Sequence, residues 1–118
     1  MSKYKSRKIT RDGETFDSLK EYNRYRELKL LERAGKISKL NRQVPYTLIP
    51  AQYETITDPK TGRKRRICLE RACTYKADFT YWENEKLIVE DVKGYRVEPY
   101  KIKKKLMLYL FGIKIKET

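Results

Sequence analysis

Alternation of apolar and polar positions divides the chain into helical and strand-like segments. Between Asp17 and Ala34 the apolar residues recur with a helical period. Ser18 followed by Glu21 three residues later is typical of a capping box, and Gly35 suits the end of a helix. The pattern therefore predicts a first helix with both ends marked.

Glu21 has two interpretations at this helix start. As a capping-box residue, its carboxylate would bond the backbone N–H of Ser18. It also lies on one stripe with Tyr25 and Leu28, which directs it toward the interior, where a carboxylate needs a partner. This placement keeps a role as an active-site acid open beside the capping role.

The middle of the chain is rich in β-branched and aromatic residues, which predicts strands. The expected strands span residues 44–49, 53–57, 67–82 and 87–93. A turn is expected over 58–62, where the composition is Asp-Pro-Lys-Thr-Gly. A second helix is expected from near Pro99 to Gly112, followed by a short strand over 113–116.

The faces of this second helix can also be predicted from its pattern. We expect its apolar side to be buried, through Ile102, Leu106, Tyr109 and Leu110. Three lysines, Lys101, Lys104 and Lys105, gather on the opposite side.

The element order, α-β-β-β-β-α-β, predicts an α/β or α+β domain with a central mixed β-sheet flanked by helices. At 118 residues the chain is long enough for one modest core. We therefore expect a single domain over 1–118, with a basic N-terminal arm over 1–11.

Charge narrows the class of partner. Lys and Arg number 29 against 16 Asp and Glu, a net charge of +13, which favours nucleic acid first and an acidic membrane surface second. No apolar run approaches the roughly 20 residues of a membrane span, and no apolar stretch follows the basic N-terminus. We therefore expect a protein of the cytosol, or of the nucleus if its source has one, that binds nucleic acid and no membrane.

The chain contains no histidine. This absence excludes Ser-His-Asp and Cys-His catalysis, histidine-ligated zinc and nucleases with a histidine base. Any chemistry must come from carboxylates, lysines and tyrosines.

A hairpin with its turn at 83–86 would carry such chemistry. Its register places Asp78 opposite Asp91, and strand alternation puts Lys93 on the same face, with Glu90 and Val92 facing away. Directly opposed carboxylates are destabilising in a sheet, unless a cation such as Mg²⁺ lies between them. The alternative is a surface hairpin with solvated charges or an Asp–Lys ion pair.

Three blocks of sequence carry a resemblance to a known superfamily. They are Phe16-Asp17-Ser18-Leu19-Lys20-Glu21, Tyr75-Lys76-Ala77-Asp78-Phe79 and Val89-Glu90-Asp91-Val92-Lys93-Gly94. Together they resemble the PD-(D/E)XK nucleases and are similar to phage-type Holliday junction resolvases and the cutting subunits of some transposases. More narrowly, the chain resembles a family of small phage and prophage proteins of uncharacterised function. Ala77 stands where the first motif has proline, a position that carries no chemistry.

The resemblance implies a restriction-endonuclease-like core and a role for each matching residue. Asp78 and Asp91 would bind Mg²⁺ or Mn²⁺, with the backbone carbonyl of Val92 as a further ligand. Lys93 would position or activate the attacking water. Glu21 would hold a water or a second metal, and Gln43 would support the site. Flanking phosphates would be held by Arg63, Lys64, Arg65, Arg66, Arg96, Lys101, Lys104 and Lys105.

We therefore predict a metal-dependent DNA endonuclease, with branched DNA among its candidate substrates. Its expected setting is phage DNA recombination, replication or packaging in the cytoplasm of a bacterial host. Cutting a four-way junction needs two active sites and would favour a homodimer. Two alternatives remain open: a non-catalytic basic nucleic-acid-binding module, and an adaptor in which a nuclease fold has lost activity.

Overall fold

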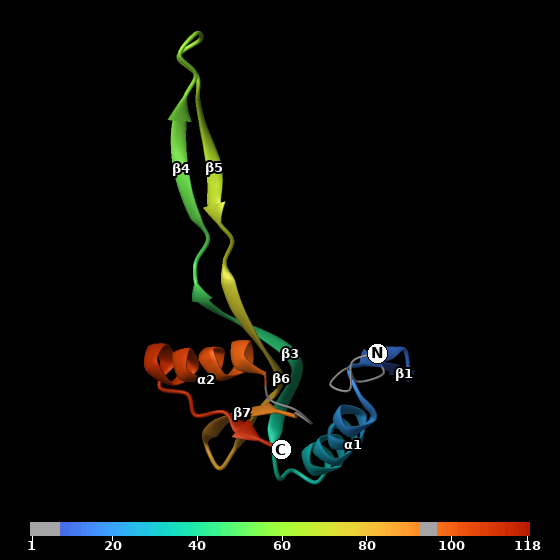
Figure 1. Ribbon diagram of the computed structural model, residues 1–118. Coiled ribbons are helices and arrows are strands. Elements are labelled where there is room, and N and C mark those ends of the chain that lie inside the picture. The colour runs from blue at the N-terminus through green and yellow to red at the C-terminus, as the bar shows by residue number, and fades with distance from the viewer. Residues whose placement is uncertain (1–7, 93–96) are drawn as a thin grey trace.

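A computed structural model describes residues 8–92 and 97–118 of the chain (Figure 1). Its central sheet has the strand order β3-β6-β7-β8, with β7–β8 parallel and the other neighbours antiparallel. In chain order the elements are β1 (Ile9–Arg11), β2 (Glu14–Phe16), α1 (Leu19–Arg33), β3 (Ser38–Ile49), β4 (Gln52–Thr57), β5 (Lys64–Glu70), β6 (Cys73–Glu83), β7 (Lys86–Asp91), α2 (Glu98–Phe111) and β8 (Lys116–Glu117). The prediction of an α+β fold with a central mixed sheet and flanking helices is confirmed.

Helix α1 begins and ends close to the predicted positions. Ser18 is its N-cap with extended backbone, and the Ser18 hydroxyl accepts a hydrogen bond of 3.1 Å from the N–H of Glu21. Gly35, with φ of +75°, follows the C-cap Ala34, as expected for a residue that must adopt the left-handed region. Local capping chemistry therefore sets both ends of the helix.

The element order differs from the prediction at two places. An additional hairpin, β1–β2, turns at Asp12 and Gly13, which have φ of 53° and 78°. An Asp-Gly pair favours such a turn, but strands of three residues are too short for a recognisable alternation. The strand expected over 67–82 is two strands, β5 and β6, because Arg71 and Ala72 separate them.

The hairpin of β6 and β7 has the predicted register. Phe79 pairs with Glu90, and Glu83 pairs with Lys86 at the far end of the ladder. The two residues between them, 84 and 85, have φ of 50° and 64°, as in the tight two-residue turns that match strand twist. The same register would place residue 78 opposite residue 91, one step beyond the last pair.

Helices α1 and α2 cover opposite faces of the sheet (Figure 1). On β7, Glu90 bonds to Arg24 of α1, whereas its neighbour Val89 packs in the core under α2. Adjacent strand residues point to opposite faces. The sheet thus separates two apolar cores, one under each helix.

The buried face of α2 differs from the prediction. Tyr100 and Met107 are its buried residues, whereas Ile102 is 56% exposed and Tyr109 is 85% exposed. A helix with apolar residues around much of its surface gives a stripe whose direction is ambiguous, and packing against β3 and β6 decides it. Within the described residues, no helix is both long and apolar enough to cross a membrane.

Strand β6 changes its packing side near its middle. Tyr75 and Ala77 belong to the core under α2, whereas Phe79 and Tyr81 belong to the core under α1. Regular alternation would place all four on one face. The change occurs around Asp78, so this residue lies at the boundary between the two cores.

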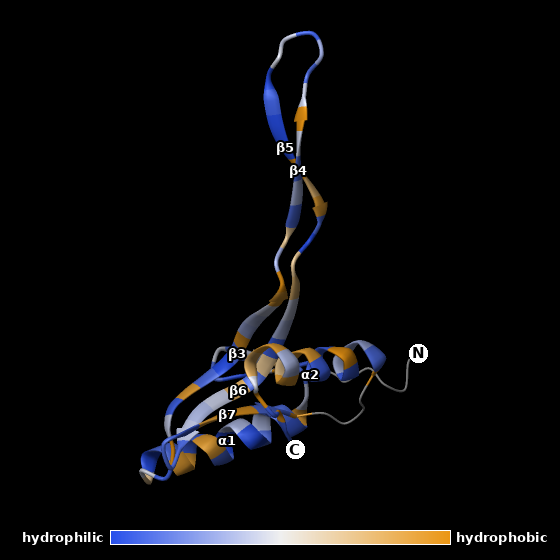
Figure 2. Cartoon of the chain, turned by 90° about the vertical axis from the view of Figure 1, so that its left-hand side faces the viewer, coloured by the Kyte–Doolittle hydropathy of each residue, from blue (hydrophilic) through white to orange (hydrophobic). Residues whose placement is uncertain are grey.

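Strands β4 and β5 form a two-stranded ribbon that projects away from the helices (Figures 1 and 2). We call residues 52–70 the basic ribbon. It continues the direction of β3 and β6 and gives the molecule extents of 65 × 42 × 29 Å. The ribbon base therefore joins the same two strands that carry Gln43 and Asp78.

Candidate active site

Asp78 is a buried carboxylate near the middle of β6. Its side chain is 4% exposed, and one carboxylate oxygen accepts a hydrogen bond of 2.8 Å from the backbone N–H of Val92. The β6–β7 ladder ends at the pair Phe79–Glu90, so this bond joins the strands just beyond the ladder. The bond fixes Asp78 against the segment that follows β7.

Three carboxylates converge at the start of α1. Oxygens of Asp17, Glu21 and Asp78 all lie within 4.8 Å of one another. We call these three residues the carboxylate cluster. Glu21 and Asp78 are buried and Asp17 is exposed, so the cluster opens to solvent on one side. The first turn of a helix has a positive partial charge, which helps to hold carboxylates there.

The pKa of Glu21 responds to this crowding of carboxylates. Burial, and then the charges of Asp78 and Asp17, raise the pKa of Glu21 to about 7, although Arg42 acts in the opposite direction. Only 2% of the residue is exposed. A carboxyl group whose pKa lies near physiological pH is typical of a functional position.

The structure separates the two interpretations of Glu21. Its backbone N–H bonds the Ser18 hydroxyl, which is one half of a capping box. Its carboxylate instead accepts a 3.0 Å hydrogen bond from the side-chain amide of Gln43 and lies 3.5 Å from the Arg42 guanidinium. Glu21 therefore faces Asp78 and the sheet, and its role as an active-site acid stays a prediction.

Gln43 lies on β3 beside this cluster, and its role in supporting the site stays a prediction. Its backbone has φ of 52°, which is uncommon for a residue with a side chain. The neighbouring pairs are Arg42–Phe79 and Val44–Ala77, so Gln43 is level with the point where β6 changes side. Irregular strand positions next to active sites often redirect a side chain; here the amide meets Glu21.

Asp91 is the last residue of β7 and is fully buried. Burial, and then the charge of Asp91, raise the pKa of the Tyr75 hydroxyl far above its ordinary value, and Asp78 adds to the effect. Both aspartates therefore influence one tyrosine, although Asp91 does not belong to the carboxylate cluster. Tyr75 is itself 4% exposed.

Glu90 points toward α1, away from its neighbour Asp91, and belongs to a buried ion pair with Arg24. Arg24 donates two hydrogen bonds to its carboxylate, of 2.6 and 2.9 Å, and the Tyr81 hydroxyl donates a third of 2.7 Å. Burial alone would raise the pKa of Glu90, but these bonds outweigh it and hold the pKa below its ordinary value. As predicted, Glu90 and Asp91 have different surroundings.

Comparison with known proteins places the chain in a family. The family model described as "Protein of unknown function (DUF1064)" matches residues 1–117. The chain belongs to the DUF1064 family. Neither a curated protein nor a solved structure matches it.

The carboxylate cluster of this DUF1064 chain fits a hard divalent cation. Carboxylate oxygens are the ligands that Mg²⁺ and Mn²⁺ prefer. Three of them within 4.8 Å repel one another, and the raised pKa of Glu21 reflects that repulsion together with burial. A cation would relieve it, because a nearby positive charge favours the ionised carboxylate.

Lys93 and Arg96 lie outside the described residues. Val92 is buried, and its N–H is bonded to Asp78; the role of its carbonyl as a ligand stays a prediction.

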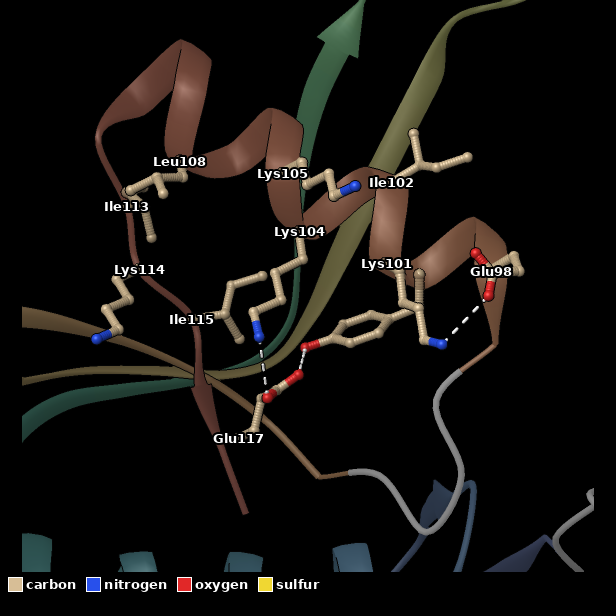
Figure 3. A pocket seen from close by; sticks show the side chains of 11 residues that line it. Glu98, Lys101, Ile102, Lys104, Lys105, Leu108, Ile113, Lys114, Ile115 and Glu117 are labelled. Atoms are coloured by element: carbon tan, nitrogen blue, oxygen red, sulfur yellow. Dashed lines mark hydrogen bonds and ion pairs between the residues drawn. The ribbon is translucent and has the colours of Figure 1, made fainter.

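The predicted phosphate-binding residues lie in two groups. Arg63, Lys64, Arg65 and Arg66 are all exposed near the tip of the basic ribbon. The α2 lysines border a hollow of about 430 Å³ between α2 and the C-terminal segment (Figure 3). There Lys101 bonds Glu98 at 3.2 Å and Lys104 bonds Glu117 at 3.1 Å. Part of the α2 charge is therefore neutralised within the chain.

Three residues of this site were missed by the sequence analysis. Asp17 had a signal, since acids are favoured before the first turn of a helix. Arg42 and Tyr75 had no such signal in the sequence. The Arg42 guanidinium lies 3.9 Å from the centroid of the Phe16 ring. The positions of Arg42 and Tyr75 depend on packing between elements far apart in the chain.

Proposed function

We propose that this DUF1064 chain is a metal-dependent DNA endonuclease of the PD-(D/E)XK type. The observation that carries the proposal is the convergence of Glu21, from α1, with Asp78, from β6, in one buried carboxylate cluster. Two of the three sequence blocks behind the resemblance thus meet in space. Asp91, from the third block, acts on the same tyrosine as Asp78.

The proposed roles follow from these positions. Asp78, Asp91 and Glu21 would hold the cation, with the carbonyl of Val92 as a further ligand. Bound Mg²⁺ would supply Lewis-acid polarisation of the phosphate and a water of lowered pKa. Lys93 would orient the attacking water and stabilise charge that develops on the phosphate.

Gln43 and Arg42 would act as positioning residues. The amide of Gln43 holds one oxygen of Glu21, and Arg42 lies beside the same oxygen. A carboxylate that is hydrogen-bonded by its neighbours keeps its orientation when a cation arrives or leaves.

The finer proposal concerns the substrate and its setting. We infer a preference for branched DNA, similar to that of Holliday junction resolvases, in phage recombination, replication or packaging in the cytoplasm of a bacterial host. The support is the resemblance of the three blocks together with a net charge of +13.

Cleavage of end-labelled linear duplex and four-way junctions with Mg²⁺, Mn²⁺, Ca²⁺ or EDTA tests the proposal. We expect cleavage with Mg²⁺ or Mn²⁺, and none for Asp78→Ala, Asp91→Ala and Lys93→Ala purified in parallel. Gel shifts on the same preparations should show retained binding, and tighter binding for the aspartate variants, because a repulsive charge is removed.

Glu85→Asn is the matched control. It removes an exposed carboxylate at the tip of the same hairpin, where φ is 64°, and asparagine tolerates that conformation. It should cut like the parent. If the three site variants also cut like the parent, the assigned site is wrong. Binding without cleavage in any cation would instead identify a non-catalytic nucleic-acid-binding module.

A further inference from the structure

The basic ribbon has almost no apolar core of its own. Within its strands only Ile56 and Ile67 are half-buried, and every other residue of β4 and β5 is exposed. An isolated two-stranded hairpin is marginally stable in water. A ribbon that extends beyond the rest of the molecule is therefore suited to contact a partner.

The charge of the ribbon tip identifies the chemistry of that partner. Residues 58–66 contain five basic residues and one acidic residue, a net charge of +4. Such a surface complements a polyanion. Two copies of this tip would repel each other, so a second copy of the chain is disfavoured as the partner.

The register places cations on both faces of the ribbon. Arg66 pairs with Thr55 and projects from one face, whereas Arg65 pairs with Ile56 and projects from the other. A flat anionic surface would engage one face only. The major groove of DNA has phosphates along both walls and is wide enough for a two-stranded ribbon.

One of these cations is held in place before any partner binds. The guanidinium of Arg66 lies over the ring of Tyr53, 3.7 Å from its centroid. A stacked guanidinium keeps its in-plane N–H groups available for phosphate oxygens. Stacking also reduces the conformational entropy that binding would otherwise cost.

The length of the ribbon sets where its tip would touch DNA. Ten residues separate Pro50 from Lys60, which is about 33 Å at the rise of a strand, about 3.3 Å per residue. One turn of B-DNA is about 34 Å. The strands at the ribbon base, β3 and β6, are those that carry Gln43 and Asp78.

We propose that the basic ribbon enters the major groove of a duplex flank and grips the phosphates of both walls, about one helical turn or more from the scissile bond. The inference rests on the proposed function, because it takes DNA as the substrate. It adds a second contact that is independent of the carboxylate cluster.

Salt-dependent binding to a 30-base-pair duplex without divalent cation (about three turns) tests the ribbon. In the ribbon variant Arg63, Lys64, Arg65 and Arg66 are all replaced by Gln. Its slope of log K against log salt should be shallower than that of the parent by about 3–4 units, from about 0.9 per lost contact. The four side chains are exposed, so circular dichroism should show an intact fold.

A matched control removes the same charge elsewhere. Arg33, Lys36, Lys39 and Lys86 are exposed and lie around the end of the sheet where Ser38 pairs with Trp82, away from the ribbon. Their combined replacement by Gln should change the slope by less than about one unit. Equal slopes for the two variants would overturn the inference, because only the net charge would then matter.

Two half-variants test the groove itself. Arg63→Gln with Arg65→Gln and Lys64→Gln with Arg66→Gln should each reduce the slope by about 2 units, because Arg65 projects from one face of the ribbon and Lys64 and Arg66 project from the other. If only one pair reduced the slope, the inference of binding in the major groove would be overturned, because the ribbon would then contact DNA through one face only. Bulky substituents at the pyrimidine 5-position project into the major groove and should weaken the parent to the level of the ribbon variant.

The outcomes separate this inference from the proposed function. If the parent binds no duplex and cuts none, the proposed function fails. If the parent binds and cuts while the ribbon variant has the parental slope, only the ribbon inference fails. A change in sedimentation mass without a change in slope would assign the ribbon to self-association and also overturn it.

Discussion

The carboxylate cluster and the basic ribbon are opposites in construction. Glu21 and Asp78 of the cluster are buried, held by bonds from Gln43 and Val92, and come from distant parts of the chain. The ribbon is a local hairpin whose cations are exposed. One region concentrates negative charge on a fixed framework, and the other presents positive charge at a distance from it.

This difference suits the carboxylate cluster to chemistry and the basic ribbon to binding. A site that holds a cation needs ligands fixed to a fraction of an ångström, so it depends on packing and on neighbouring hydrogen bonds. Phosphate contacts need charge and reach, and each contributes nearly independently. Changes in the cluster should therefore alter cleavage, and changes in the ribbon should alter affinity.

The largest expected contrast is between two adjacent acids, Asp91 and Glu90. Asp91→Asn should reduce cleavage by more than about 100-fold, because even partners of metal ligands are worth about 10–100-fold. Glu90→Gln should leave cleavage intact but lower the free energy of unfolding by about 3–5 kcal/mol, because Arg24 loses its buried partner. Urea denaturation and cleavage well below the melting temperature measure the two effects.

The reverse outcome is equally informative. Loss of cleavage in a folded Glu90→Gln protein, with activity in Asp91→Asn, would exchange the roles of these two acids.

The next effect concerns pH and Glu21 in the absence of divalent cation. Because the folded-state pKa of Glu21 is raised from 4.5 to about 7, its contribution to stability is largest below pH 4.5 and is lost as pH rises through 7. The loss is about 3 kcal/mol, because each tenfold difference in proton affinity between the folded and unfolded chain is worth about 1.4 kcal/mol. In EDTA, Glu21→Gln should therefore be the more stable protein at pH 8 and should melt close to the parent at pH 4.5.

Mg²⁺ provides the control for that measurement. At pH 8 it should stabilise the parent more than Glu21→Gln, and the variant should lose most cleavage. Normal cleavage by Glu21→Gln would leave the residue with its helix-start role only.

A smaller effect is expected at Gln43. Gln43→Ala should reduce cleavage by about 10–100-fold, because Glu21 loses the amide that orients it. Gln43→Gly removes the same amide but suits the positive φ of 52°, so it should cut as poorly while melting higher. If Gln43→Gly cuts like the parent, backbone strain and not the amide explains the alanine result.

The smallest effect should come from Tyr53 on the ribbon. Tyr53→Ala removes the ring under Arg66, worth about 0.5–1 kcal/mol at an exposed site, so DNA affinity should fall about 2–5-fold. Tyr53→Phe keeps the ring and should bind like the parent in fluorescence titrations. Both variants should cut normally at saturating protein, which is the opposite of what cluster variants do.

Local features of this molecule could be predicted from sequence. The ends of α1 follow from Ser18 and Gly35, and the register of β6 with β7 follows from a short turn. The faces of α2 were predicted wrongly, because its apolar residues cover more than one side and tertiary packing selects among them.

The part of the site that depends on local strand geometry could also be predicted from the sequence. Asp78 and Asp91 share a hairpin, so its register predicts that they lie opposite each other, but the carboxylate cluster of the structure joins Asp78 to Asp17 and Glu21. The meeting of Glu21 and Gln43 with Asp78 joins three elements, and only the resemblance anticipated it. Tyr75 could not be anticipated, because its place depends on where β6 changes its packing side.

The ribbon also governs how the molecule moves through solvent. The radius of gyration of the whole molecule is 19.0 Å, whereas a compact chain of 118 residues has a radius of gyration of about 13.5 Å. Friction follows shape as well as mass, so a single 14.2 kDa chain should elute from a sizing column ahead of compact standards of its own weight. A monomer would then resemble a dimer, and light scattering is the measurement that assigns the number of active sites per particle.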